Sequence, residues 1–318
     1  MNKRPTNNGA VATRWLSHCL AAALVAALGY YVWKNWAKHS DSLDISLSAA
    51  ILICLCILGA WLVNAAQSTL MLRVNLIRSG FFENLLVQTA AILGNYLPMR
   101  AGTALRFHYF KVVHKVDYSL FGGLSAVRMV LLILATSFAS LLGLIATEHE
   151  FSRTLWLLYG GLAAIGISLL VGIRYVRFSP TSRLGAISIR FVEGFASIGR
   201  HPWEACATLG LIFVQFSLLG VRMAICFAII GQSISPSSLL LIVPIATLLS
   251  FLTITPGNLG LREWTIGAVS LAAGLDLSTG VFAATLDRAI LVALTFAIGG
   301  PSLWWTLIKI RHARKSAN

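Results

Sequence analysis

Long apolar segments separated by short basic links dominate this sequence and restrict what the chain can fold into. Hydrophobic residues make up 57% of its 318 residues and charged residues only 11%, whereas a soluble domain carries about a quarter charged residues. Such a chain has too little polar surface to cover a core in water, so it needs the bilayer as its solvent. The sequence therefore predicts an all-α polytopic membrane protein whose single integral membrane domain covers residues 15–308.

Six apolar segments reach the roughly 20 residues that a helix needs to span the hydrocarbon. They are Trp15–Trp33, Ile45–Leu72, Ser119–Thr147, Leu155–Ile173, Ala205–Ile230 and Thr279–Ile308. Three shorter stretches do not reach it, namely Leu85–Pro98, Leu239–Thr255 and Trp264–Leu275. Proline and glycine interrupt these stretches, and broken backbone at membrane depth needs protein or a wet cavity around it. We therefore expect about six full spanning helices plus two re-entrant or broken helical elements.

The basic residues predict which side of the membrane each link faces. The formal net charge is +14, and Lys and Arg gather in short links, which is the positive-inside pattern. It predicts cytoplasmic termini at residues 1–14 and 309–318, and short elements that enter from opposite faces. An amphipathic helix is expected near Leu184–Ile198. We find no nucleic-acid-binding motif.

The two broken elements resemble each other. In each, a proline lies four residues before a glycine, an arginine follows, and the next long helix carries another arginine about ten residues from its start. The residues are Pro98, Gly102, Arg106 and Arg128 in one element, and Pro256, Gly260, Arg262 and Arg288 in the other. This pattern predicts an inverted pseudo-repeat, with halves at about 84–147 and 239–308. Broken helices at matching places mark a transporter's binding site.

Three arginines lie deep inside apolar segments: Arg128, Arg222 and Arg288. A central arginine costs at least about 2.5–3.5 kcal/mol to insert. One interpretation is a structural ion pair or a cap on broken-helix carbonyls. The other is a site for a lipid phosphate, which arginine binds with its planar fork. Only two carboxylates, Glu263 and Asp287, lie at similar depth, so the surplus of cations favours an external anion.

The broken turns favour the same chemistry, because free N–H groups at a helix start attract anions; a packing kink is the alternative. The predicted anion-binding residues are Arg100, Arg106, Arg128, Arg222, Arg262 and Arg288, with Glu263 and Asp287 as counter-charges. The predicted turn residues are Pro98, Gly102, Pro256, Gly257, Asn258 and Gly260. We see no metal-ligand spacing, nucleotide motif or catalytic arrangement, and so expect no metal, cofactor or enzymatic activity.

Two motifs carry a family resemblance: Leu97-Pro98-x-Arg100-Ala101-Gly102-x-x-x-Arg106 and Pro256-Gly257-x-Leu259-Gly260-x-Arg262-Glu263. They resemble the signatures of the lysylphosphatidylglycerol synthetase transmembrane family, flippase-like proteins similar to the membrane domain of the multiple peptide resistance factor. The resemblance covers Trp15 to Ile308. It implies six to eight helices with paired re-entrant elements in a bacterial cytoplasmic (inner) membrane. It also implies movement of an anionic or modified phospholipid, or a lipid-linked sugar, between leaflets. Arg128 and Arg288 match the family's intramembrane arginines.

Some positions depart from the family pattern. Met99 stands where the family often has glycine, and Asn258 replaces a glycine. Thr103 stands where an acid is frequent, and Val127 precedes Arg128 where an acid is common. The missing acids weaken the expectation that a cationic headgroup binds. No aminoacyl-transferase domain follows Lys309, so we do not expect lipid lysylation.

Three functions stay open at this point. A lipid translocator that works by alternating access is favoured. A membrane-embedded transferase for lipid-linked sugars would need Glu263 or Asp287 as its base. A non-catalytic partner of an envelope-biosynthesis enzyme is the third. Ala139 and Gly143, one turn apart, suit close helix packing within or between chains, so a homo-oligomer also stays open.

Overall fold

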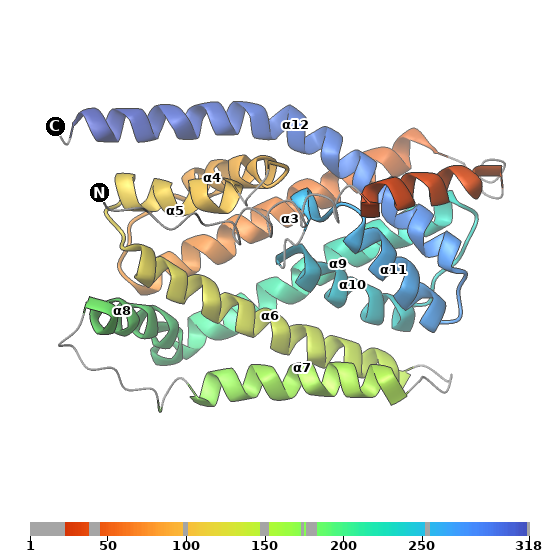
Figure 1. Cartoon of the computed structure of the whole chain (residues 1–318), viewed down its shortest axis with the longest axis horizontal. Coiled ribbons are helices and arrows are strands. Elements are labelled where there is room, and N and C mark those ends of the chain that lie inside the picture. The colour runs from red at the N-terminus through yellow and green to blue at the C-terminus, as the bar shows by residue number, and fades with distance from the viewer. Residues whose placement is uncertain are drawn as a thin grey trace, which may run out of the picture.

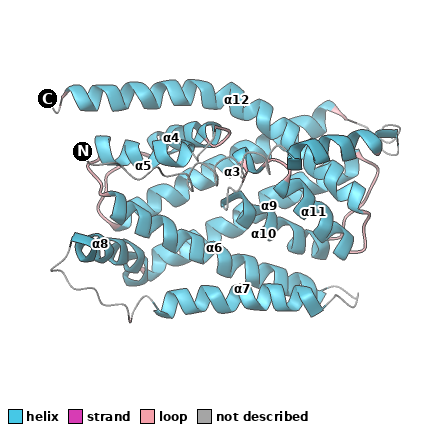
Figure 2. Cartoon of the chain, in the orientation of Figure 1, coloured by secondary structure: helices cyan, strands magenta, loops and turns pink. Residues whose placement is uncertain are grey.

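The computed structural model describes residues 23–37, 45–97, 101–146, 153–172, 175, 183–251 and 255–316. Regular structure in these residues is entirely helical (Figure 2), which confirms the predicted all-α fold. The helices are α3 (Leu47–Val74), α4 (Phe81–Gly94), α5 (Ala101–Val113), α6 (Tyr118–Ala146), α7 (Arg153–Gly172), α8 (Arg183–Ser197), α9 (Pro202–Ile229), α10 (Pro236–Phe251), α11 (Leu261–Ala272) and α12 (Leu277–Lys315), with 3₁₀ turns η2 (Ile198–Arg200) and η3 (Pro256–Asn258).

Five helices are long and apolar enough to cross a membrane, judged by length and composition: α3, α6, α7, α9 and α12. They match five of the six predicted spans. The sixth, Trp15–Trp33, lies partly outside the described residues, and its residues 23–33 are helical. Large apolar side chains such as Leu157 and Ile167 on α7 are exposed, as a lipid-facing helix requires. The protein is therefore an integral multi-pass membrane protein.

Several boundaries differ from the sequence prediction, and helix α5 lies outside the predicted segments. Helix α12 continues to Lys315, so most of the predicted tail at 309–318 extends this helix. Helix α4 begins at Phe81, four residues before the predicted Leu85. Glu83 allows this earlier start because its carboxylate accepts a hydrogen bond from the Gly80 N–H at 3.1 Å, which caps the helix.

Four short helices form two hairpins. Helices α4, α5, α10 and α11 are 14, 13, 16 and 12 residues long, which is roughly 18–24 Å at 1.5 Å per residue and too short for the hydrocarbon. Helix α4 packs on α5, and α10 packs on α11. In Figure 1 the α4–α5 hairpin lies toward the end of the molecule where the chain's C-terminus is marked, and the α10–α11 hairpin lies toward the other end.

The long helices tie the two hairpins together. Helices α3 and α9 pack on each other, helix α6 packs on α10, and helix α12 packs on α4. The long helix that follows each hairpin therefore packs against the first arm of the other hairpin. Figure 1 shows α6 and α12 running along the length of the molecule on either side of this arrangement.

Glycines allow several of these helices to touch backbone to backbone. A Cβ atom at Gly102 would lie 1.8 Å from the carbonyl oxygen of Ala91, so Gly102 is the packing residue between α4 and α5. The amphipathic helix α8, predicted near Leu184–Ile198, crosses α6 in the same way: a Cβ at Gly123 would lie 2.1 Å from the carbonyl oxygen of Phe191. Small residues at a crossing permit such an approach.

Gly143 packs α6 against α10 within the chain. Ala139 is buried, and a Cβ at Gly143 would lie 2.9 Å from the Cβ of Leu240. These two residues are therefore occupied inside one protomer, and the homo-oligomer stays a prediction without their support.

Replacing Gly102 by Ala is expected to destabilise the protein by about 1–3 kcal/mol, the range for overpacking, because its methyl group has no room beside Ala91. Thermal unfolding of the purified protein in detergent measures this change. Gly161→Ala is the matched control, because nothing lies within 4 Å of a Cβ at this helical position. Equal melting temperatures for the two variants would contradict the close α4–α5 contact.

Candidate functional site

The tips of the two hairpins contact each other. The N–H of Gly257 donates a hydrogen bond of 2.8 Å to the carbonyl oxygen of Asn95, the residue that ends α4. Gly257 has a φ of 59°, a left-handed conformation that glycine adopts without strain. A Cβ there would lie 2.7 Å from the ring of Tyr96. Gly257 thus gives the turn its left-handed conformation and lets the two hairpins pack closely at Tyr96.

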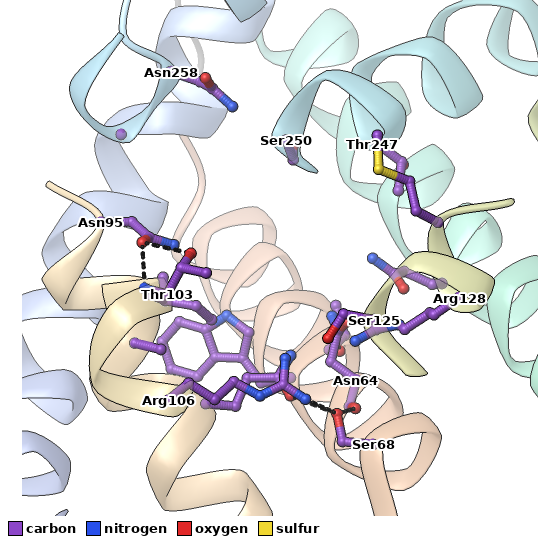
Figure 3. Close-up of a pocket in the computed structure, with 18 of the residues that line it drawn as sticks. Asn64, Ser68, Asn95, Thr103, Arg106, Ser125, Arg128, Thr247, Ser250 and Asn258 are labelled. Atoms are coloured by element: carbon purple, nitrogen blue, oxygen red, sulfur yellow. Dashed lines mark hydrogen bonds between the residues drawn. The ribbon is translucent and has the colours of Figure 1, made fainter. Parts of the chain in front are cut away.

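A cavity of about 410 Å³ adjoins these tips, within the range of roughly 300–1,000 Å³ typical of ligand pockets. Helices α3, α4, α5, α6, α9, α10, α11 and α12 all contribute lining residues. Figure 3 shows polar side chains around it, including Asn64, Ser68, Arg106 and Arg128. Five arginines line the cavity: Arg106, Arg128, Arg222, Arg262 and Arg288.

Asp287 forms ion pairs with two of these arginines. Its Oδ1 accepts from Arg222 Nε at 2.5 Å, and its Oδ2 accepts from Arg222 Nη2 at 2.8 Å and from Arg262 Nη2 at 2.9 Å. Asp287 has no exposed surface. The three residues come from α9, α11 and α12, so this ion triad also ties these helices together. Arg222 and Asp287 therefore form the structural ion pair that was one of the two sequence interpretations.

Arg288 is only partly neutralised. Its Nε lies 3.7 Å from Glu263 Oε1, and its guanidinium carbon lies 5.6 Å from the centre of the Tyr96 ring. Glu263 itself is buried and uses its other oxygen to accept from the Gly260 N–H at 2.8 Å. Within the described residues, Nε and Nη2 of Arg288 and Nη1 of Arg262 are buried without a hydrogen-bond partner. Buried polar atoms of this kind require a water or a ligand.

Arg106 and Arg128 enter the cavity from α5 and α6 and reach neighbouring turns of α3. Arg106 Nη2 donates to the Ser68 hydroxyl at 3.0 Å, and Arg128 Nη2 donates to Asn64 Oδ1. Figure 3 shows both arginines directed toward α3. Arg106 also lies over the Phe121 ring, 5.2 Å from its centre. Among the described residues, Arg106 has no carboxylate at ion-pair distance.

Most of the residues predicted from the sequence to bind an anion lie around this cavity. Gly257 and Asn258 line the cavity beside the five arginines, whereas Gly102 and Gly260 lie at the hairpins' packed turns. Pro98 and Arg100 lie outside the described residues, and only the backbone of Pro256 is described. The anion-binding role of these residues stays a prediction.

The expectation of free N–H groups at both helix starts is wrong for two of them. The Thr103 N–H donates to Asn95 Oδ1 at 3.1 Å, and the Gly260 N–H donates to Glu263. Each of these two amides therefore already has a side-chain acceptor within its own hairpin.

Sequence reasoning missed the neutral polar residues of the cavity. Asn64 and Ser68 lie four residues apart in the apolar helix α3, and Gln88 and Asn95 lie in or next to α4. The signal was present, because Asn64 and Ser68 share one helix face. Such a signal is weak, because amides and hydroxyls are tolerated in apolar helices at far lower cost than charges. Within the described residues, no group of three or more His, Cys, Asp or Glu is placed to hold a metal ion.

Asp287→Asn is expected to reduce the free energy of unfolding by about 3–5 kcal/mol, because it leaves two guanidinium groups buried without their carboxylate. Arg222→Met is expected to cost less, since Asp287 keeps Arg262. Denaturant titration in detergent compares the two variants. The triad loses its assigned role if Asp287→Asn unfolds at the wild-type denaturant concentration.

Comparison with known proteins places the chain in a family. Residues 18–299, most of the chain, match the family described as the lysylphosphatidylglycerol synthase TM region. No curated protein matches the chain. The family match covers the five long helices up to residue 299, both hairpins and all five cavity arginines, and it confirms the resemblance that the two motifs predicted. The chain therefore belongs to the lysylphosphatidylglycerol synthase TM region family.

Proposed function

We propose that this chain is a lipid translocator of a bacterial cytoplasmic membrane and that its cavity holds the phosphate of the moving lipid. The observation that carries the proposal is the charge balance at the cavity. Five arginines line it, and among the described residues two carboxylates lie against them. An uncompensated charge in an apolar surrounding is costly, so an anion from the membrane stabilises the site.

Arg106 and Arg128 form the proposed phosphate-binding pair. Their hydrogen bonds to Ser68 and Asn64 use neutral acceptors, which orient a guanidinium group without cancelling its charge. Arginine suits phosphate because its planar fork donates two parallel N–H bonds to two oxygens. The unpartnered nitrogens of Arg288 add donors on the side of the cavity formed by α12.

We also propose that the two hairpins are re-entrant elements of an inverted repeat, with α3–α6 as one half and α9–α12 as the other. The packing supports this. If α3 to α6 correspond to α9 to α12 in order, the contact of α6 with α10 corresponds to the contact of α12 with α4, and the contact of α3 with α9 corresponds to itself. Arg128 and Arg288 follow the first residues of α6 and α12, Tyr118 and Leu277, at nearly equal spacing. With cytoplasmic termini, the α4–α5 hairpin enters from the inside and the α10–α11 hairpin from the outside.

Alternating access is the mechanism that this arrangement favours. In the described residues, a backbone hydrogen bond from Gly257 to Asn95 and the packing of the Tyr96 ring against Gly257 link the hairpin tips beside the cavity. We propose that the tips separate toward the cytoplasmic side or toward the outer side of the membrane, and that the cavity thereby opens to each leaflet in turn. Such movement around a fixed central site is common in transporters built from inverted repeats.

The enzymatic alternative receives less support. A membrane transferase needs a carboxylate base that faces its substrate. Glu263 and Asp287 are fully buried, and both are engaged by arginine or backbone N–H groups. Among the described lining residues none carries a carboxylate. We therefore propose that the chain is not itself an enzyme. A non-catalytic role beside an envelope-biosynthesis enzyme is the remaining alternative.

Arg106→Gln and Arg128→Gln are each expected to slow lipid translocation at least about ten-fold, because a charge-assisted hydrogen bond contributes roughly 1.5–3 kcal/mol. The assay follows tail-labelled fluorescent phosphatidylglycerol in proteoliposomes of the purified chain, with the outer leaflet quenched by dithionite. Arg73→Gln, an exposed arginine in the last turn of α3, is the control and should keep the wild-type rate. Wild-type rates in both cavity variants would remove the proposed site, and no transport by the wild-type chain would favour the partner role.

Opposite entry of the hairpins predicts opposite labelling of two single cysteines. In a cysteine-free background, Arg78→Cys before α4 should react with a membrane-impermeant maleimide only from the cytoplasmic side. Ala272→Cys at the end of α11 should react only from the outside. Both positions are exposed, so burial does not prevent the reaction. Labelling of both from the same side would contradict the inverted arrangement.

A further inference from the structure

We propose that the cavity selects a headgroup that carries a phosphate and hydroxyl groups but no amine. This proposal rests on the proposed lipid site and names the class of headgroup it takes. The proposed class is a phosphatidylglycerol-like polyol phosphate or a sugar phosphate on a lipid, as opposed to an aminoacylated or choline-bearing lipid.

The first support is the absence of a carboxylate from the described cavity lining. An ammonium group on the headgroup needs an anionic partner or aromatic rings when it leaves water, and the rings of Phe121 and Tyr96 already lie under Arg106 and Arg288. The two carboxylates that lie against the arginines face protein groups: Asp287 accepts from Arg222 and Arg262, and Glu263 accepts from the Gly260 N–H through Oε2 while its Oε1 lies 3.7 Å from Arg288 Nε. Both have no exposed surface, so neither is presented to a bound lipid.

The second support is the chemistry of the rest of the lining. Ten of the described lining residues are Asn, Gln, Ser or Thr, and these side chains both donate and accept hydrogen bonds. Ser125 and Asn64 lie near Arg128, while Thr103 and Asn95 lie across from them in Figure 3. A polyol needs such paired donors and acceptors around its hydroxyl groups. Arginines beside neutral polar groups thus match a phosphate with attached hydroxyls.

The third support is a difference between the two halves. Asp287 directly precedes Arg288 in α12, whereas the buried Val127 directly precedes Arg128 in α6. The position that corresponds to Asp287 is therefore apolar in the half that holds Arg106. An amine placed beside Arg106, whose described hydrogen-bond partner is the neutral Ser68 hydroxyl, would meet its positive charge, which repels it.

Equilibrium binding tests this inference separately from transport. The purified full chain in detergent is titrated with dihexanoyl phosphatidylglycerol, its lysyl ester and dihexanoyl phosphatidylcholine. Phosphatidylglycerol is expected to bind at least about ten-fold more tightly than the other two, because each of them brings a positive charge toward the arginines. Equal or tighter binding of the lysyl ester would overturn the inference. Equal competition by soluble glycerol phosphate would also overturn it, by assigning the site to a free phosphate ester.

Thr103→Glu tests whether the missing acid sets this preference. Thr103 lines the cavity, is exposed and lies in the first turn of α5, where an acid is compatible with the helix dipole. The variant is expected to lower the ratio of phosphatidylglycerol affinity to lysyl-ester affinity at least about three-fold. Thr103→Gln, similar in size but neutral, should keep the wild-type ratio. A ratio unchanged by Thr103→Glu would show that the cavity does not set the preference.

The two experiments separate the proposals. Preferential binding of phosphatidylglycerol without translocation would keep the headgroup class and remove the translocator. Translocation together with tighter binding of the lysyl ester would keep the translocator and remove the proposed headgroup class.

Discussion

A guanidinium group inside an apolar domain needs a partner, and this requirement organises the centre of the protein. Removal from water penalises the charged form strongly, and arginine does not escape the penalty by losing its proton. Asp287 accepts three hydrogen bonds from Arg222 and Arg262 and balances one of their two charges. Arg106 has only a hydroxyl and an aromatic ring as its described partners. The positive charge that remains is the basis of the proposed lipid site.

The broken helices bring polar backbone and side chains to the same place. Asn95 is central to this arrangement, because its carbonyl oxygen accepts from Gly257 of the other hairpin while its side chain accepts from Thr103 of its own hairpin. Close packing at Gly102 holds the two arms together. In the described residues, the two hairpins therefore meet through a backbone hydrogen bond and through the Tyr96 ring, which lies against Gly257.

The sequence predicts much of this architecture because hydropathy is a local property. Five spans, the short helices α4, α10 and α11 and the amphipathic α8 follow from segment length and composition, whereas the basic helix α5 was not predicted. The partners of the arginines do not, since Arg222 and Asp287 are 65 residues apart and meet only through tertiary packing. Neutral residues such as Asn64 were overlooked for a different reason: amides and hydroxyls are tolerated in helices that cross membranes. The cap formed by Glu263 on Gly260 can be predicted from the sequence, because an acid three residues after a helix start is a capping signature.

The central claim is that Arg106 and Arg128 hold a lipid phosphate. An electron cryomicroscopy structure of the full chain in nanodiscs of phosphatidylglycerol tests it most directly. The account predicts headgroup density in the cavity, with phosphate oxygens within hydrogen-bond distance of both guanidinium groups. A structure in the same nanodiscs with an empty cavity, and with Arg106 paired to a protein carboxylate, would contradict it.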